Sequence, residues 1–185
     1  MSKNRIVAIF ITVAIAILGV FIFLTFRPVK TVTDTAEITE IERLMVKNIE
    51  TDYPATPREV VKLYNRYLLA IYNADTTDDQ IRQLLDKQRS LYDEELLSVN
   101  PFDNNYSGII AETAEYKKEG RTIVNTTVGG SDEVIYKQFE GRSYALIDAS
   151  YFMRSNGGNF SKTYETYMLR KDVEGKWRIL GFAKA

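Results

Sequence analysis

The stretch RSYALIDASYFMR, residues 142–154, decides the fold class, because its side chains alternate between the two faces of an extended chain. The apolar positions of one parity are Ala145, Ile147, Ala149, Tyr151 and Met153. This two-residue period is typical of a β-strand with one buried face. We therefore expect a long strand here and a sheet built around it.

Four more strands are expected around this segment, separated by turns rich in glycine and asparagine. Gly129 and Gly130, for example, are expected to turn the chain between the first two strands. The expected strands are Thr122–Val128, Glu133–Phe139, Arg142–Arg154, Phe160–Lys171 and Lys176–Ala183. Because the connections are short, the strands should form an antiparallel meander.

The chain before Gly120 has the periodicity of helices. Capping patterns of the form Thr-x-x-Glu or Thr-x-x-Gln mark helix starts at Thr39, Thr56 and Thr77. The expected helices run from Thr39 to before Pro54, from Thr56 through Ile71, from Thr77 to Asn100 and from Asp103 to Glu119. Helices followed by an antiparallel sheet predict an α+β fold, with the helices packed on one face of a curved sheet.

An uncharged apolar run, residues 6–26, precedes the domain. As a helix it measures about 31 Å, which matches the hydrocarbon thickness of a bilayer. The run is longer than the core of a cleaved signal peptide and lacks the small residues of a cleavage site, so a retained anchor is favoured over a signal peptide. We expect a transmembrane helix at residues 6–26.

The chain is expected to have four parts: a cytoplasmic tail (1–5), the transmembrane helix (6–26), a linker (27–37) and one domain (38–185). Basic residues flank the run equally, so the positive-inside rule gives little orientation. All acidic residues lie at or beyond Asp34, and the tail is too short to have a function of its own. We therefore expect a single-pass protein of the cell membrane with an extracytoplasmic domain.

The composition excludes several kinds of chemistry. The chain has no histidine and no cysteine, which removes histidine bases, cysteine nucleophiles, disulfides and thiolate metal sites. Apart from the four cations that flank the apolar run, 20 basic residues stand against 25 acidic ones, a net charge of about −5. This charge predicts no attraction to nucleic acid or anionic lipid. No metal and no cofactor is expected.

Two further motifs carry a resemblance to a known superfamily. They are the helix entry TPREVV, Thr56–Val61, and the closing hairpin Tyr167–Phe182, which ends in GKWRILGF. Together they resemble the nuclear transport factor 2-like superfamily, also called the SnoaL-like or cone fold. The resemblance implies an opening helix against a strongly bent sheet, whose concave face can hold a small ligand. The whole layout is similar to membrane-anchored bacterial proteins of this kind, especially from Gram-positive bacteria.

Aromatic residues are the candidates for a ligand site on that concave face. The possible pocket-lining residues are Tyr64, Tyr67, Tyr151, Tyr167 and Trp177. Aromatic side chains are also favoured in strands and in cores, and a core role is the stronger expectation for this set. Trp177 is expected to be buried within the last hairpin.

The acidic residues support no catalytic assignment. Enzymes of the superfamily resemble each other in placing an Asp base beside tyrosine or acid donors, and Asp148 and Glu165 are acids inside expected strands. Asp148 lies opposite the apolar parity of its strand, which predicts a solvated position. Asp78 and Asp79 suit the first turn of a helix, and Asp93–Glu95 is expected on a solvated helix face. We assign no catalytic residue.

Two functions follow from this reasoning. The favoured one is a membrane-tethered, extracytoplasmic interaction or scaffolding domain, not an enzyme, that binds a protein partner or a second copy. It is favoured by the anchor, the short linker and the lack of catalytic motifs, and single-pass subunits of type IV secretion systems are similar in plan. The alternative is a small-molecule-binding domain or an enzyme that uses an aromatic-lined cavity.

Overall fold

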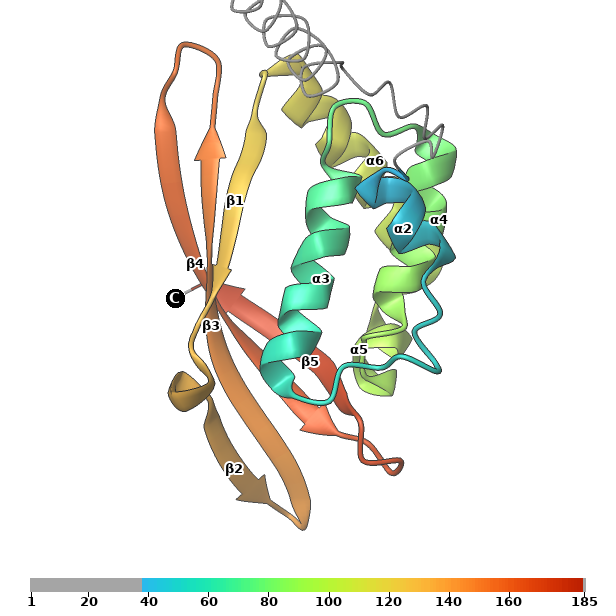
Figure 1. Ribbon diagram of the computed structural model, residues 1–185, viewed down its shortest axis with the longest axis vertical. Coiled ribbons are helices and arrows are strands. Elements are labelled where there is room, and N and C mark those ends of the chain that lie inside the picture. Colours follow the sequence, from blue (N-terminus) through green and yellow to red (C-terminus); the bar gives the residue numbers. More distant parts are fainter. Residues whose placement is uncertain (1–37, 185) are drawn as a thin grey trace, which may run out of the picture. The chain divides into compact units, whose positions relative to one another are not determined.

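Helices and strands form two layers, with the helices on one face of the sheet (Figure 1). The structure, a computed structural model, describes residues 38–184. The helices are α2 (Glu40–Val46), α3 (Pro57–Ile71), α4 (Asp78–Arg89), α5 (Glu94–Val99) and α6 (Phe102–Lys118). The strands are β1 (Thr122–Val128), β2 (Ile135–Phe139), β3 (Arg142–Arg154), β4 (Phe160–Lys171) and β5 (Trp177–Lys184). The predicted α+β class, with a five-stranded antiparallel sheet, is confirmed.

Threonine side chains begin three of the helices, as the capping patterns predict. Thr39 accepts a hydrogen bond from the N–H of Glu42, and the Glu42 carboxylate accepts one from the N–H of Thr39. Thr77 and Gln80 form the same reciprocal pair at α4. Thr56 caps α3. These bonds satisfy N–H groups that have no partner within the first helical turn.

Helix α2 ends earlier than its periodicity predicts. It stops at Val46, because the Asn48 side chain accepts hydrogen bonds from the N–H groups of Glu50 and Thr51, at 3.1 and 3.3 Å. An Asn side chain that binds nearby backbone in this way competes with the helix. Ile49, expected on the helix, is still buried, but it lies in the turn that follows.

The third expected helix is two helices, α4 and α5, with residues 90–93 between them. The carbonyl of Leu91 accepts from the N–H of Ile179 in β5, and the N–H of Asp93 donates to the Ile179 carbonyl, both at 2.8 Å. These bonds replace the helical ones and cover the free edge of β5. Asp93 then caps α5 by accepting from the N–H of Glu95 at 3.0 Å.

The order of the strands differs from the predicted meander. Strands β1 and β2 both pair with β3 and lie one after the other along the same edge of it. Both are antiparallel to β3, so the chain does not reverse at Gly129 and Gly130. It passes instead through a short 3-10 helix, η1 (Ser131–Glu133), while the N–H of Gly129 donates to the carbonyl of Asp148 at 2.9 Å. Strand β3 is long enough to pair with both.

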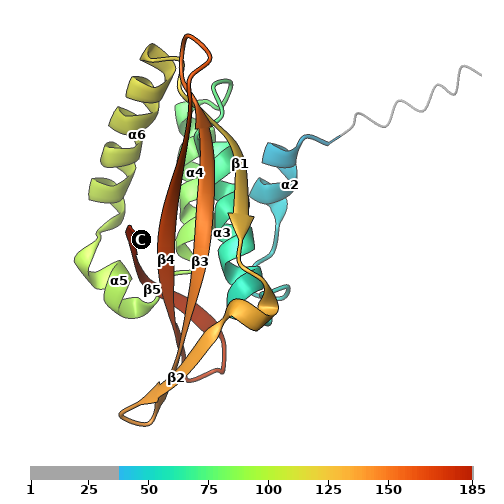
Figure 2. The same ribbon diagram turned by 90° about the vertical axis from the view of Figure 1, so that its left-hand side faces the viewer.

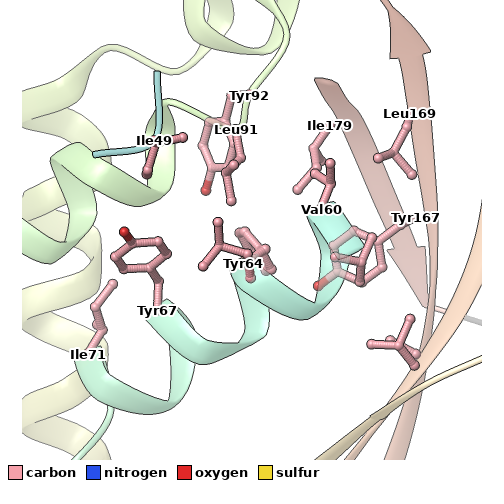
Figure 3. Close-up of a cluster of buried hydrophobic side chains, with 14 of the residues drawn as sticks. Ile49, Val60, Tyr64, Tyr67, Ile71, Leu91, Tyr92, Tyr167, Leu169 and Ile179 are labelled. Carbon is pink, nitrogen blue, oxygen red and sulfur yellow. The ribbon is translucent and has the colours of Figure 1, made fainter. Parts of the chain in front are cut away.

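The core lies between α3 and the inner face of the sheet (Figure 3). On β3, the predicted apolar parity points inward, and Ala145, Ile147 and Ala149 are fully buried. Helix α3 contributes the opposing face, including Val60, Tyr64, Tyr67 and Ile71. Leu91 and Ile179 close this core where the residues between α4 and α5 meet β5.

The predicted transmembrane helix, residues 6–26, lies outside the described residues, as do the predicted tail and linker. Within residues 38–184, no helix combines the length and the apolar character needed to cross a membrane. The described chain forms one compact unit, which begins at Ile38.

Candidate functional site

A chain of polar side chains crosses the core between α3 and the sheet. The Tyr151 hydroxyl donates to the Asn65 side-chain oxygen at 2.9 Å and lies 2.5 Å from the Tyr167 hydroxyl, which donates to the Glu165 carboxylate at 3.0 Å. Asn65, Tyr151 and Tyr167 are all at least 96 % buried. This polar network therefore links three elements, α3, β3 and β4, inside the molecule.

The polar network contains three contacts, but its two tyrosines offer only two hydroxyl protons. The amide nitrogen of Asn65 is buried and has no partner among residues 38–184. If this amide is turned by 180°, its nitrogen donates to Tyr151, Tyr151 donates to Tyr167, and Tyr167 donates to the Glu165 side chain. All three contacts are then satisfied.

The tyrosines of the core stay neutral. Burial raises the pKa of Tyr64, Tyr151 and Tyr167 above the ordinary value of a phenol, and burial raises the pKa of Tyr67 to about 12. Tyr67 donates to the Leu44 carbonyl at 3.2 Å. Protonated hydroxyls of this kind are hydrogen-bond donors and not bases at neutral pH.

The structure separates the five residues that were considered as possible pocket lining. Tyr64, Tyr67, Tyr151 and Tyr167 belong to the core, where the rings of Tyr64 and Tyr167 meet edge to face at 5.5 Å. Trp177 is buried too, as predicted, but its ring packs beside Tyr136 of β2, with the centroids 5.7 Å apart. Core packing therefore accounts for the four tyrosines.

Trp177 lines an open hollow of about 270 Å³ at the end of the β2–β3 hairpin. The other lining residues are Tyr136, Lys137, Gln138, Ser143 and Tyr144. A second hollow, of about 320 Å³, lies between the end of α3 and the start of β1, where Tyr72 and Arg154 form part of the wall. Both hollows are away from the polar network.

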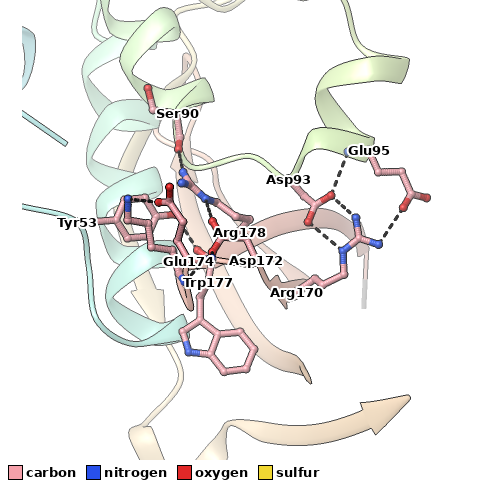
Figure 4. Close-up of polar contacts among 10 residues, drawn as sticks. Tyr53, Ser90, Asp93, Glu95, Arg170, Asp172, Glu174, Trp177 and Arg178 are labelled. Atoms are coloured by element: carbon pink, nitrogen blue, oxygen red, sulfur yellow. Dashed lines mark hydrogen bonds and ion pairs between the residues drawn. The ribbon is translucent and has the colours of Figure 1, made fainter. Parts of the chain in front are cut away.

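Two arginines of the last two strands form polar contacts with the helix layer (Figure 4). Arg170 forms a bidentate ion pair with Asp93 and a second ion pair with Glu95 at 3.0 Å. Arg178 binds Asp172 at 2.8 Å and donates to the carbonyl of Ser90. The expectation that Asp93 lies on a solvated helix face was wrong, since its side chain is 6 % exposed and needs Arg170 to compensate its charge.

The outer face of the sheet, turned away from the helices, is uncovered (Figure 2). Its positions follow from the register, because even-numbered residues of β3 and β4 lie opposite one another. Large apolar side chains exposed on this face are Ile135, Phe139, Phe152, Phe160, Tyr164 and Met168. The rings of Phe152 and Phe160 stack with their centroids 5.1 Å apart.

Comparison with models of known protein families assigns the chain to one family. A family model described as "Domain of unknown function (DUF6715)" matches residues 1–182. The chain belongs to the DUF6715 family. No match is found among curated proteins. The matched region of this DUF6715 protein contains both the apolar run at residues 6–26 and the strands of the domain.

The two acids weighed for catalysis lie on opposite faces of the DUF6715 sheet. Asp148 is exposed on the outer face, as predicted, and accepts from the Thr166 hydroxyl at 2.6 Å. Glu165 is half-buried on the inner face, at the end of the polar network. The two carboxylates therefore cannot act on one substrate atom.

Metal binding draws no support from the described part of this DUF6715 domain. Residues 38–184 contain no group of three or more carboxylates placed to hold an ion. Asp78 and Asp79 occupy the first turn of α4, where they complement the helix dipole as expected.

Two features of the DUF6715 domain were missed in the sequence. The buried ion pair of Asp93 with Arg170 joins residues 77 positions apart, and no local pattern signals it. The outer face was partly signalled, because β4 alternates Phe160, Lys162, Tyr164 and further exposed residues against its buried parity. A strand with aromatic residues on its solvent parity is the signal that identifies such a surface.

Proposed function

We propose that this DUF6715 protein is held in a membrane by one transmembrane helix, residues 6–26. Its domain, residues 38–185, then acts on the extracytoplasmic side as an interaction domain and not as an enzyme. The uncharged apolar run supports the anchor, since its length suits a bilayer. The family match supports treating anchor and domain as one unit, because it covers both.

The interaction role is carried by one observation, the uncovered outer face. Phe160 is 59 % exposed and Tyr164 is 50 % exposed, although both are large aromatic side chains. Single exposed apolar residues are ordinary, whereas a group of them on one face marks an interaction site. On the opposite face, helix α3 packs over Ile147, Ala149 and Tyr167, so the outer face is the surface that a partner would contact.

The alternative, a small-molecule site in an aromatic cavity, has less support. The rings of Tyr64 and Tyr167 pack edge to face, and the hydroxyls of Tyr151 and Tyr167 are engaged within the polar network. The hollow beside Trp177 is open and lies at the periphery. A site for a drug-sized ligand generally buries most of the ligand surface.

We also propose that the domain is a cone fold of the nuclear transport factor 2-like kind. The order of helices before an antiparallel sheet supports this, as does the position of α3, whose apolar side packs along the inner face. The extra helix α2 and the helix α6 before β1 are additions to the minimal pattern.

Alkaline carbonate extraction of membranes tests the anchor. Ile15→Arg together with Ala16→Arg places two charges at the centre of residues 6–26, and each charge costs about 2.5–3.5 kcal/mol on insertion scales. The double variant should be released by carbonate, whereas the wild type and the matched Ile15→Leu/Ala16→Leu variant should stay with the membrane. Equal release of all three chains would remove the basis of the proposal.

Photo-crosslinking in native membranes tests the interaction role. A benzoylphenylalanine at Tyr164 lies on the outer face, and one at Glu115 lies exposed on α6 as the control. Adducts with protein or with lipid should form from position 164 and not from position 115. The proposal is wrong if the two positions give the same adducts, or if position 164 gives none.

A further inference from the structure

The outer face carries cations as well as apolar side chains. By register, Lys137 of β2, Arg142 and Arg154 of β3 and Lys162 of β4 belong to it, and Arg154, at the end of β3, also borders the hollow beside α3. None of the four forms an ion pair with another residue in the range 38–184. The Lys162 ammonium lies 4.9 Å from the centre of the Tyr164 ring.

Negative charge is scarce on the same surface. Asp148 is its one carboxylate on β3 and β4, and the Thr166 hydroxyl already donates to it. Arg170, which shares the parity of the outer face, is neutralised by Asp93 and Glu95. The face therefore has an excess of positive charge among aromatic rings.

The helix layer has the opposite charge. Residues 38–119 contain 16 acidic and 10 basic side chains, whereas residues 120–184 contain 7 acidic and 10 basic ones. At physiological ionic strength charges are screened beyond about 8 Å. The electrostatic attraction of a molecule to the outer face therefore depends on the cations nearby and not on the net negative charge of the domain.

Three occupants can be compared for this face. A second copy would bring the same four cations against themselves, and like charges across an interface are repulsive. Nucleic acid would satisfy the cations, but the proposed topology places the domain outside the cell. An anionic bilayer satisfies the cations, and it also accepts aromatic side chains, which favour the headgroup region.

The linker makes this contact geometrically possible. Residues 27–37 lie between the predicted transmembrane helix and Ile38, where the described unit begins. Fully extended, eleven residues reach about 36–40 Å. In the proposed topology this length is an upper limit on the separation of the domain from the bilayer, so contact between them is within reach.

We propose that the outer face docks onto the anionic surface of the same membrane in which the chain is anchored. Lys137, Arg142, Arg154 and Lys162 bind phosphate groups of acidic lipids, while Phe152, Phe160 and Tyr164 enter the headgroup region. This inference rests on the proposed membrane anchor. It adds that the partner of the outer face is the lipid itself.

The test uses the full chain reconstituted in vesicles of phosphatidylcholine alone or mixed equally with phosphatidylglycerol. Because the chain has no cysteine, Thr127→Cys on the outer side of β1 and Gln83→Cys on α4 can each be labelled with one fluorophore. A headgroup-spin-labelled lipid serves as the quencher. The label at 127 should be quenched in the mixed vesicles and released by high salt, and the label at 83 should be quenched in neither.

A charge variant sharpens the result. Neutralising all four outer-face cations to Gln should lower the ratio of docked to free domain by roughly 10²–10³-fold, since each cation near an anionic surface contributes about fivefold. The matched control neutralises four exposed or half-exposed cations of the helix layer and should leave quenching at 127 unchanged. The control residues are Arg43, Lys62, Lys87 and Lys118.

Several outcomes would overturn the inference. One is equal quenching at 127 in both kinds of vesicle, and another is an equal loss of quenching in the two charge variants. Quenching that depends on protein density and not on anionic lipid would assign the face to a second copy. Carbonate extraction of the same vesicles separates the two proposals: release of the chain contradicts the anchor, whereas retention without quenching contradicts only the docking.

Discussion

The two faces of the sheet are built from the same strands but have different neighbours. On β3, Ala145, Ile147 and Ala149 are buried under α3, while Asp148 and Phe152, of the other parity, are exposed. The inner face buries apolar area against a close-packed layer, which supplies stability. The outer face contributes little to that packing, so its residues are free to serve binding. Substitutions on the inner face should therefore lower the stability of the domain, whereas matched substitutions on the outer face should leave it almost unchanged.

The largest difference is expected between neighbours on β4. Leu169 is fully buried and Met168 is 40 % exposed, so Leu169→Ala should destabilise the domain by about 3–5 kcal/mol through the cavity it leaves. Met168→Ala should change stability by less than about 0.5 kcal/mol. Urea unfolding of the full chain in detergent, followed by the fluorescence of Trp177, measures both. Similar losses would mean that the outer face is packed as tightly as the inner one.

Arg170 is an exception among the residues of outer-face parity, because its side chain is covered by Asp93 and Glu95 at the start of α5. Asp93→Asn removes the charge that faces this guanidinium but keeps a side-chain oxygen that can cap α5, and should cost about 3 kcal/mol. Glu95→Ala removes the solvent-exposed half of the same cluster and should cost less than about 1 kcal/mol. The same unfolding experiment applies. If the two variants lose equal stability, the burial of the Asp93 pair has no energetic weight.

Loss of a tyrosine hydroxyl should lower stability more in the polar network than on the outer face. Tyr151→Phe keeps the ring but leaves Asn65 and Tyr167 short of a partner in a buried place, which should cost about 1–3 kcal/mol. Tyr164→Phe removes a solvated hydroxyl and should be neutral within about 0.5 kcal/mol. The difference between the unfolding free energies decides it, and a neutral Tyr151→Phe would show that the network is not closed.

The smallest expected change in stability comes from Asp172, in the turn between β4 and β5 at the edge of the sheet. Burial raises the pKa of Asp172, but hydrogen bonds from Arg178 and from the N–H groups of Lys176 and Glu174 outweigh it and hold this pKa below its ordinary value. Stability from this carboxylate is therefore present above about pH 4 and lost as the pH falls through its lowered folded-state pKa.

Asp172→Asn provides the measurement for this pH window. The variant should be less stable than the wild type by about 1 kcal/mol or less at neutral pH, because the pair is only partly buried. The difference should shrink as the pH falls below about 4, where the wild-type carboxylate becomes protonated. Glu174→Gln is the control, and a difference that stays constant down to low pH would contradict the ionic origin.

Sequence patterns predicted elements well where their cause is local. The start of α3 at Thr56 and the full length of β3 follow from a capping residue and from two-residue alternation, and both were confirmed. The break at residues 90–93 could not be predicted, because it depends on hydrogen bonds to Ile179 of the last strand. The linear arrangement of β1 and β2 was missed for the same reason, since both pair with β3, which follows them.

The candidate site shows the same division. Aromatic residues such as Tyr151 and Tyr167 were identified from the sequence, and so was their stronger tendency to form a core, which the structure bears out. Their joining with Asn65 and Glu165 into one polar network was not visible, because Asn65 and Tyr151 are 86 positions apart. The partners of a buried polar group are set by packing and not by spacing along the chain.

By itself, the sequence determined the α+β class, the caps of the helices, the parity of the strands and the absence of histidine and cysteine chemistry. These depend on bonds and side-chain directions within a few residues. Tertiary structure alone decided that β1 and β2 share one edge of β3, which carboxylate is buried with Arg170, and where the cations gather. A net negative charge predicted no attraction to anionic surfaces, but folding sorts the charges between two faces. Charge interactions are short-ranged in salt, so their placement matters more than their sum.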